Sequence, residues 1–325
     1  MVWVVVLALG VIAPLMVVLS RAPAPPPLPS PNGYDDLLKA SAAAGTNGYS
    51  YGLVSNAALR KLVSSNAQAL RLVRLGLTRQ CAVPSAAAMT NNAALLNDLA
   101  GMKGLALLLM AESRVHLEDN QPAAAAACCL DAMRLGNEIS RRGILLHRRV
   151  GIACEAIARY DLVKFVTTLS PAEARPVIAT LQEIDRTRVS FDDVMRQERS
   201  SFYRQLRANG NPVLWVRALW DFRATRQMAL AHHKVIVAYN HLVATELALR
   251  CYRADKSCVP ARLEDLVPDY LRRVPEDPFL GRPLIYRPEG TNWLLYSVGP
   301  DGVDDGGRPG RYWNSSPGDL PYNGP

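Results

Sequence analysis

The stretch LLLMAESRVHLEDNQPAAAAACCLDAMRL, residues 107–135, decides the fold. Its two halves are rich in leucine and alanine, and a polar run at 119–122 separates them. Proline at position 122 suits the first turn of a helix, because the N–H that it lacks would have no partner there. We therefore predict that one helix ends in this run and that the next begins there. The small residues at 123–127 would let the two helices approach closely.

Helical patterns extend over most of the chain. In 56–77, apolar residues recur at intervals of three, four and seven, which predicts an amphipathic helix. Ser170, with proline directly after it and Glu173 three residues on, is a typical helix start. A last long helix is predicted over 226–250. The helix pair in 91–142 resembles a tetratricopeptide-type pair, but only one copy is present, so a full repeat array is not expected.

The pattern changes after residue 259. A small helix is expected at 261–271, followed by two strands, PLIYRP at 283–288 and NWLLYSV at 292–298. Proline and glycine in the connection between them predict a hairpin. The expected fold class is therefore mainly α, with a small C-terminal α+β module that contains a short antiparallel sheet.

We expect five segments along the chain. They are a membrane anchor (1–20), a proline-rich stalk (21–33), a helical domain (34–225), the C-terminal module (226–310) and an irregular tail (311–325).

The N-terminal segment MVWVVVLALGVIAPLMVVLS, residues 1–20, carries no charge and is close to the length of about 20 residues that spans a bilayer. It predicts an uncleaved membrane anchor. Arg21 follows the segment and no basic residue precedes it, which by itself would place the rest of the chain in the cytoplasm. The proline-rich stalk and an expected disulfide favour the other side. We expect an extracytoplasmic body, and the orientation stays open.

Charge and cysteines narrow the possible partners. The net charge is +8, but the basic residues are dispersed along helices without a nucleic-acid-binding motif, so no nucleic-acid partner is expected.

Cys251 and Cys258 flank a short loop, and a disulfide there would stabilise the fold by about 2–3 kcal/mol. Two free thiols in a reducing compartment are the alternative. The six cysteines and five histidines show neither C-x-x-C nor H-x-x-x-H spacing, so we expect no structural zinc site.

The stretch LLYSVGPDGVDDGG, residues 294–307, has the composition of a cation-binding loop. Calcium takes six to eight oxygen ligands from a loop that wraps it, and glycines permit the wrapping. The candidate ligands are the carboxylates of Asp301, Asp304 and Asp305 and the backbone carbonyls of Leu295 and Val298. The alternative is a tight turn in which the aspartates cap their own backbone.

Two motifs in this region carry a resemblance. DPFLG at 277–281 and SVGPDG at 297–302 resemble, in order and spacing, the C-terminal domain of type II secretion major pseudopilins. The resemblance implies calcium in the loop with Asp301 as a ligand, and a second ligand beyond the Gly-Gly pair, where only Asp319 is available. It also implies a role beside envelope secretion machinery, with the membrane and other envelope proteins as partners. The chain departs from the family because no prepilin-peptidase site precedes the apolar segment, and about 200 further residues intervene.

The chain as a whole resembles an uncharacterised group of membrane-anchored bacterial proteins, which implies no activity. We expect a structural or interaction protein rather than an enzyme, and no small-molecule substrate is indicated. One alternative is a tetratricopeptide-like module that binds a peptide or protein in a groove around 95–165. A third reading is a serine hydrolase, because GYSYG at 48–52 fits the G-x-S-x-G pattern with Ser50 as nucleophile; no strand pattern precedes it.

Overall fold

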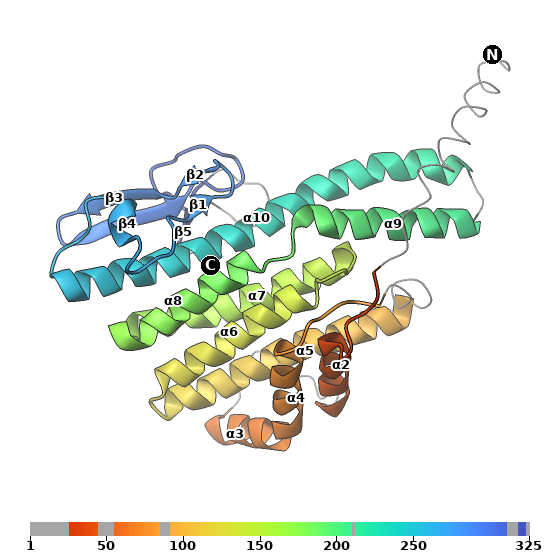
Figure 1. Cartoon of the computed structure of the whole chain (residues 1–325), viewed down its shortest axis with the longest axis horizontal. Helices are drawn as coiled ribbons and strands as arrows, with labels where there is room; N and C mark the ends of the chain where they lie inside the picture. The colour runs from red at the N-terminus through yellow and green to blue at the C-terminus, as the bar shows by residue number, and fades with distance from the viewer. Residues whose placement is uncertain (1–25, 45–54, 85–91, 210–211, 311–317, 323–325) are drawn as a thin grey trace, which may run out of the picture.

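The computed structural model describes residues 26–44, 55–84, 92–209, 212–310 and 318–322. Over these ranges the chain is mainly helical, with a small antiparallel sheet at its C-terminal end, as predicted. The helices are α2 (Gly33–Ala43), α3 (Asn56–Ser65), α4 (Ala67–Leu77), α5 (Asn92–Glu118), α6 (Pro122–Glu138), α7 (Leu145–Phe165), α8 (Pro171–Arg186), α9 (Phe191–Asn209) and α10 (Pro212–Lys256). Figure 1 shows them stacked in layers, with α10 crossing above α8 and the strands on the far side of α10.

The predicted helix pair is α5 and α6, and the turn between them lies where Pro122 indicated. Alanine gives the close approach that the sequence predicts: Ala125 and Ala126 are fully buried. Ser113 on α5 donates a 3.0 Å hydrogen bond to the carbonyl oxygen of Ala125 on α6. The pair is therefore held by small side chains and by one hydrogen bond across the helices.

Glycine sets an even closer crossing between α6 and α7. A Cβ placed on Gly136 would lie 2.4 Å from the carbonyl oxygen of Gly151, and a Cβ on Gly151 would lie 2.1 Å from the carbonyl oxygen of Gly136. No side chain fits at either position unless the helices separate. These two residues therefore fix α7 against the α5–α6 pair.

Helix α10 continues through the predicted domain boundary at 225/226. It runs without interruption from Pro212 to Lys256, and its second half packs on α8 and α7 on one side and on the small sheet on the other. Apolar residues of both regions belong to one buried cluster, including Leu247 on α10, Leu181 on α8 and Leu295 in the sheet. The predicted boundary thus falls inside α10, and the two regions share this helix and this core.

The predicted hairpin is confirmed by strands β3 (Ile285–Glu289) and β4 (Asn292–Ser297), which pair antiparallel. A third strand, β5 (Leu320–Pro321), pairs with β4, so the tail predicted as irregular closes the sheet. Strands β1 (Glu276–Asp277) and β2 (Arg282–Pro283) form a separate two-stranded ribbon. The small helix predicted at 261–271 is reduced to a 3-10 turn, η2 (Leu263–Leu266), since Pro268 disfavours helical geometry in the residue before it.

Two other predictions are corrected at the N-terminal side. The helix predicted over 56–77 breaks at Asn66 into α3 and α4. The described part of the predicted stalk, 26–32, lies against the body instead of leading away from it. Arg142 donates to the carbonyl oxygen of Pro27 at 3.0 Å, and the Asn32 amide exchanges hydrogen bonds of 2.9 and 3.0 Å with the backbone of Ala82.

The predicted disulfide between Cys251 and Cys258 is absent, and both cysteines are free. The reason is that α10 continues past Cys251 to Lys256. Cys251 is buried, with its sulfur 3.9 Å from the carbonyl oxygen of Pro171 at the start of α8, whereas Cys258 is exposed beyond the helix end. The sequence suggested a loop at 252–257, but most of that segment is the last turn of the helix.

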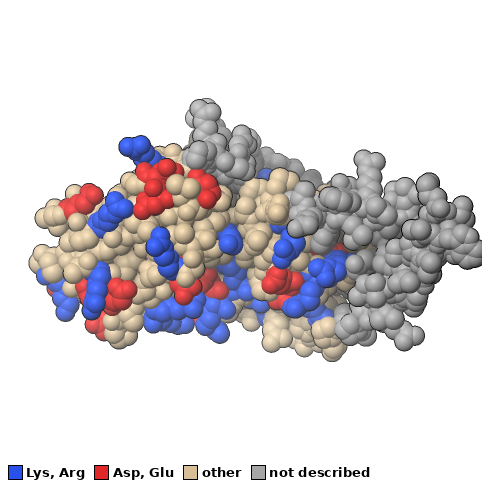
Figure 2. All heavy atoms as spheres, turned by 90° about the horizontal axis from the view of Figure 1, so that it is seen from above, with Lys and Arg blue, Asp and Glu red and all other residues tan. Residues whose placement is uncertain are grey.

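One helix among the described residues, Ala93–Glu118 within α5, is long and apolar enough to cross a membrane. Its residues Leu99, Met102, Leu105 and Leu109 are buried against neighbouring helices, as in the core helix of a folded bundle. The anchor predicted at 1–20 lies outside the described residues. On the face shown in Figure 2, acidic and basic side chains are scattered among other residues over the described part of the surface.

Candidate functional site

A hydrogen bond joins the turn at Asp277 to the start of the glycine–aspartate loop, residues 298–307. Asp277 is fully buried, and its two carboxylate oxygens accept hydrogen bonds from the N–H groups of Phe279 (2.8 Å) and Val298 (2.9 Å). The two motifs that carried the sequence resemblance therefore meet in space. Asp277 holds the point at which β4 enters the loop, and both of its oxygens have a partner.

Asp301 closes the loop onto the segment that leads to β5. Its carboxylate accepts from the N–H of Val303 at 3.2 Å and from the N–H of Gly318 at 2.9 Å. The close approach needs glycine at 299, where φ is +72° and a Cβ would lie 2.6 Å from the carbonyl oxygen of Gly318. The residue that the sequence favoured as the main ligand therefore caps and closes the loop.

Asp304 is also satisfied by protein groups. It accepts from the Tyr296 hydroxyl at 2.7 Å, from the N–H of Gly306 at 2.9 Å and from the Arg287 guanidinium at 3.3 Å. The hydrogen bond from Tyr296, followed by that from Gly306 and by the charge of Arg287, holds the pKa of the Asp304 carboxyl below its usual value.

Asp305 and Asp319 differ from the other two aspartates, because each has a buried carboxylate oxygen without a hydrogen-bond partner, Oδ2 of Asp305 and Oδ1 of Asp319. Asp319 is fully buried, and its other oxygen accepts from the N–H of Gly307 at 2.6 Å. Burial raises the pKa of the Asp319 carboxyl, the backbone N–H groups of Gly307 and Asp305 lower it in part, and the negative charges of Asp304 and Asp305 raise it further. The loop thus concentrates negative charge around Asp319, whose Oδ1 has no hydrogen-bond partner in the part of the chain that the structure describes.

The backbone candidates lie just before this loop and at its first residue. Leu295 is in β4 opposite Tyr286, Val298 directly follows the strand, and both are buried. No three of the described aspartates have carboxylate oxygens that all lie within 4.8 Å of one another. Among the described residues, only Glu112, His116 and Cys128, in the helical region, have ligand atoms that close. The loop therefore offers two carboxylate oxygens without partners among the described residues, rather than a closed cluster of carboxylates.

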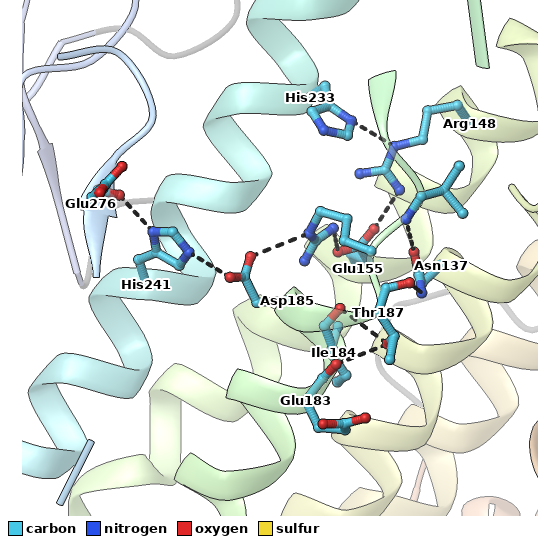
Figure 3. A network of polar contacts seen from close by, with 12 residues as sticks. Asn137, Arg148, Glu155, Glu183, Ile184, Asp185, Thr187, His233, His241 and Glu276 are labelled. Carbon is cyan, nitrogen blue, oxygen red and sulfur yellow. Dashed lines mark hydrogen bonds and ion pairs between the residues drawn. The ribbon is translucent and has the colours of Figure 1, made fainter. Parts of the chain in front are cut away.

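A second polar group, missed by sequence reasoning, lies inside the helical region (Figure 3). Glu155 on α7 is fully buried and accepts from the Arg148 guanidinium at 2.7 Å and from the Arg188 guanidinium at 2.6 Å. Burial alone would raise the pKa of the Glu155 carboxyl, but the two guanidinium groups outweigh it and hold the pKa below its usual value. Arg148 also donates to His233 Nδ1 at 3.1 Å. Burial, together with the charges of Arg148 and Arg188, lowers the pKa of His233 to about 3, so its ring is neutral.

A chain of polar contacts joins the helical region to the strands through His241 on α10. Its Nε2 lies 3.1 Å from the Asp185 carboxylate on α8, and its Nδ1 lies 2.7 Å from the carbonyl oxygen of Glu276 in β1. Both partners are hydrogen-bond acceptors, so the ring donates to both when it carries two protons. Figure 3 shows His241 between the two regions. The only sequence signal for these contacts was ionisable residues inside apolar helical segments.

Ser50, the candidate nucleophile, lies outside the described residues. No protein-family model, no curated protein and no solved structure matches the chain.

Proposed function

We propose that the chain is a membrane-anchored, extracytoplasmic protein with a structural or interaction role in a bacterial envelope, and that calcium stabilises its C-terminal module. The observation that carries the calcium proposal is that two buried carboxylate oxygens without partners among the described residues, on Asp305 and Asp319, belong to mutually repelling carboxylates of one loop. Buried polar atoms in folded proteins nearly always have a partner. A bound cation would supply one, and it would offset the repulsion among the loop carboxylates.

The ligands would come from both ends of the loop. Asp305 and Asp319 would contribute their unpartnered oxygens. Asp301 and the carbonyl groups of Leu295 and Val298 remain proposed ligands, since a carboxylate oxygen that accepts one N–H retains a lone pair. Asp304 is less suited, because the Arg287 guanidinium already compensates its charge. Calcium tolerates such a mixed, irregular set of carboxylates, carbonyls and water.

The location and role rest on the sequence. The uncharged segment 1–20 has the length of a membrane span, and weak calcium sites serve in compartments where calcium is abundant. A position beside type II secretion machinery rests on the pseudopilin resemblance of 277–302. A non-enzymatic role is part of the same proposal.

The tetratricopeptide-like alternative receives little support. Among the described residues of 95–165, the exposed large apolar side chains are Leu96 and Tyr160. The core faces of α5, α6 and α7 pack against one another and against their neighbours. This arrangement favours a helical body that supports the C-terminal module over an open peptide groove.

The experiment is a thermal melt of the full chain in detergent, with calcium and then with excess chelator. We expect calcium to raise the melting temperature, since a ligand at about 100 times its Kd stabilises the native state by about 2.7 kcal/mol. The rise should be lost in Asp319→Asn and reduced in Asp301→Ala. Asp269→Asn is the matched control, because Asp269 is an exposed carboxylate outside the loop. A melt indifferent to calcium would overturn the calcium proposal.

A further inference from the structure

Three potential metal ligands lie together far from the aspartate loop, at the turn between α5 and α6. Glu112 and His116 are four residues apart on α5, so they share one face of that helix. Cys128 is on α6 and faces them. One ligand atom from each of the three lies within 4.8 Å of the other two.

We propose that Glu112, His116 and Cys128 form a zinc site that fastens α5 to α6. Carboxylate, imidazole and thiolate are all ligands that Zn²⁺ uses, and a water molecule would complete the tetrahedron. With Zn–S near 2.3 Å and Zn–O near 2.0 Å, a tetrahedral S···O edge is about 3.5 Å. The observed separation of Cys128 Sγ and Glu112 Oε2 is 3.5 Å. That edge of the site is therefore already at its bound length.

The histidine is held by a neighbouring amide. Nδ1 of His116 lies 2.9 Å from Oε1 of Gln121, an acceptor, so Nδ1 carries the proton and the lone pair is on Nε2. Hydrogen bonds of this kind orient ligand histidines in metal sites. Gln121 stands in the turn directly before α6, so the same turn that pairs the helices also orients the ring.

The guanidinium group of Arg74 lies in part of this site. Nη2 of Arg74, on α4, lies 2.6 Å from Glu112 Oε2 and 3.7 Å from Cys128 Sγ. Nε of the same guanidinium lies 3.2 Å from Asp131 Oδ2. The Arg74 side chain is 41% exposed, so it can leave Glu112 and keep Asp131. Zinc would therefore exchange with the guanidinium at Glu112, and the Cys128 thiol would release its proton to water as the Zn–S bond forms.

The sequence analysis predicted no structural zinc site, because the three residues follow none of the usual motif spacings. Glu112 and Cys128 come from different helices, and only the fold brings them together. The site is independent of the calcium proposal, since it lies in the helical region and includes an imidazole and a thiolate.

The test uses Co²⁺ as a spectroscopic probe on the metal-free full chain. We expect a thiolate-to-cobalt charge-transfer band that Zn²⁺ abolishes. Cys128→Ser should lose the band, and the neighbouring Cys129→Ser should keep it, because the Cys129 sulfur contacts Ser113 on the other side. His116→Asn, a change at a partly exposed residue, should weaken Co²⁺ binding by about tenfold or more, which is 1.4 kcal/mol or more. His116→Asn also tests the site if Cys128→Ser does not fold.

A separate variant tests whether the metal ion displaces the Arg74 guanidinium from Glu112. Arg74→Gln removes the competing cation and should tighten Co²⁺ binding by about tenfold; unchanged or weaker binding would contradict the exchange. No charge-transfer band in the unmodified chain at saturating Co²⁺ would overturn the site. An unchanged band in Cys128→Ser, or unchanged affinity in His116→Asn, would overturn it as well.

Discussion

The helical region and the aspartate loop treat buried carboxylates in opposite ways. Glu155 lies between two guanidinium groups at hydrogen-bonding distance, and its pKa is lowered. Asp319 is equally buried, but one of its oxygens has no partner and its pKa is raised. The difference lies in the neighbouring charges, because Glu155 has two guanidinium groups beside it, whereas the carboxylates of Asp304 and Asp305 lie near Asp319.

The largest effect is expected from removing the charge of Glu155. Glu155→Gln would leave Arg148 buried without a counter-charge and Arg188 with only Asp185, 3.7 Å away, and should lower the free energy of unfolding by about 3–5 kcal/mol. Denaturant titration measures the change. Asp255→Asn is the control, since it breaks an exposed pair with Arg175 and should cost about 1 kcal/mol or less. Similar losses in both variants would remove the contrast between buried and exposed pairs.

The contact between the sheet and α10, the helix that both regions share, can be tested at Trp293 in β4. Its indole N–H donates to Glu246 on α10 at 2.8 Å, and Arg250 holds the other oxygen of the same carboxylate at 2.7 Å. Trp293→Phe keeps most of the packing but removes this donor, so the free energy of unfolding should fall by about 1–2 kcal/mol. If the strands separated from the helices in an earlier transition, the two regions would not share one cooperative core.

A smaller effect of opposite sign is expected in the loop. In chelator, Asp319→Asn removes a buried charge without a counter-ion, while its amide oxygen can still accept from Gly307. Its free energy of unfolding should equal or exceed that of the unmodified chain, by up to about 1 kcal/mol. A loss comparable to that of Glu155→Gln would show that the loop carboxylate is compensated without calcium.

The smallest effect is the pH dependence of that gain. A carboxyl with a raised pKa in the folded state contributes stability below its unfolded pKa of about 3.9, and that contribution is lost as the pH rises through the folded pKa. In chelator, the advantage of Asp319→Asn should therefore shrink as the pH falls from 7 towards 4. Glu155 has a lowered pKa, so its contribution is lost only on stronger acidification. A gap that widens towards pH 4 would contradict the sign of the shift at Asp319.

Local signals in the sequence predicted the local structure well. Ser170 and Glu173 form the expected capping box at the start of α8, and proline at 122 marks the α5–α6 turn. The Pro-Glu-Gly-Thr connection gives the predicted hairpin. Each of these features depends on residues within one turn of one another.

The features that sequence reasoning missed depend on distant residues. Strand β5 exists because the tail returns to pair with β4, and no nearby residue indicates this return. Arg188 meets Glu155 only after α7 and α8 have packed. In the loop, the sequence identified the aspartates but ranked Asp301 first. The contacts from Val303 and Gly318 show that the oxygens without partners belong to Asp305 and Asp319.

The position of β5 also constrains the order in which the protein is made. The helices α2 to α7 can pack as soon as they leave the ribosome, because their main partners precede them or follow closely. The third strand of the sheet cannot pair until Leu320 has emerged, and Asp319 cannot accept from Gly307 in the loop before that point. During synthesis, β4 therefore stays open at one edge, and an open strand edge is a template for pairing with other chains. A chain that ends before residue 320 would have a folded helical body and an unpaired edge on β4 that can pair with other chains.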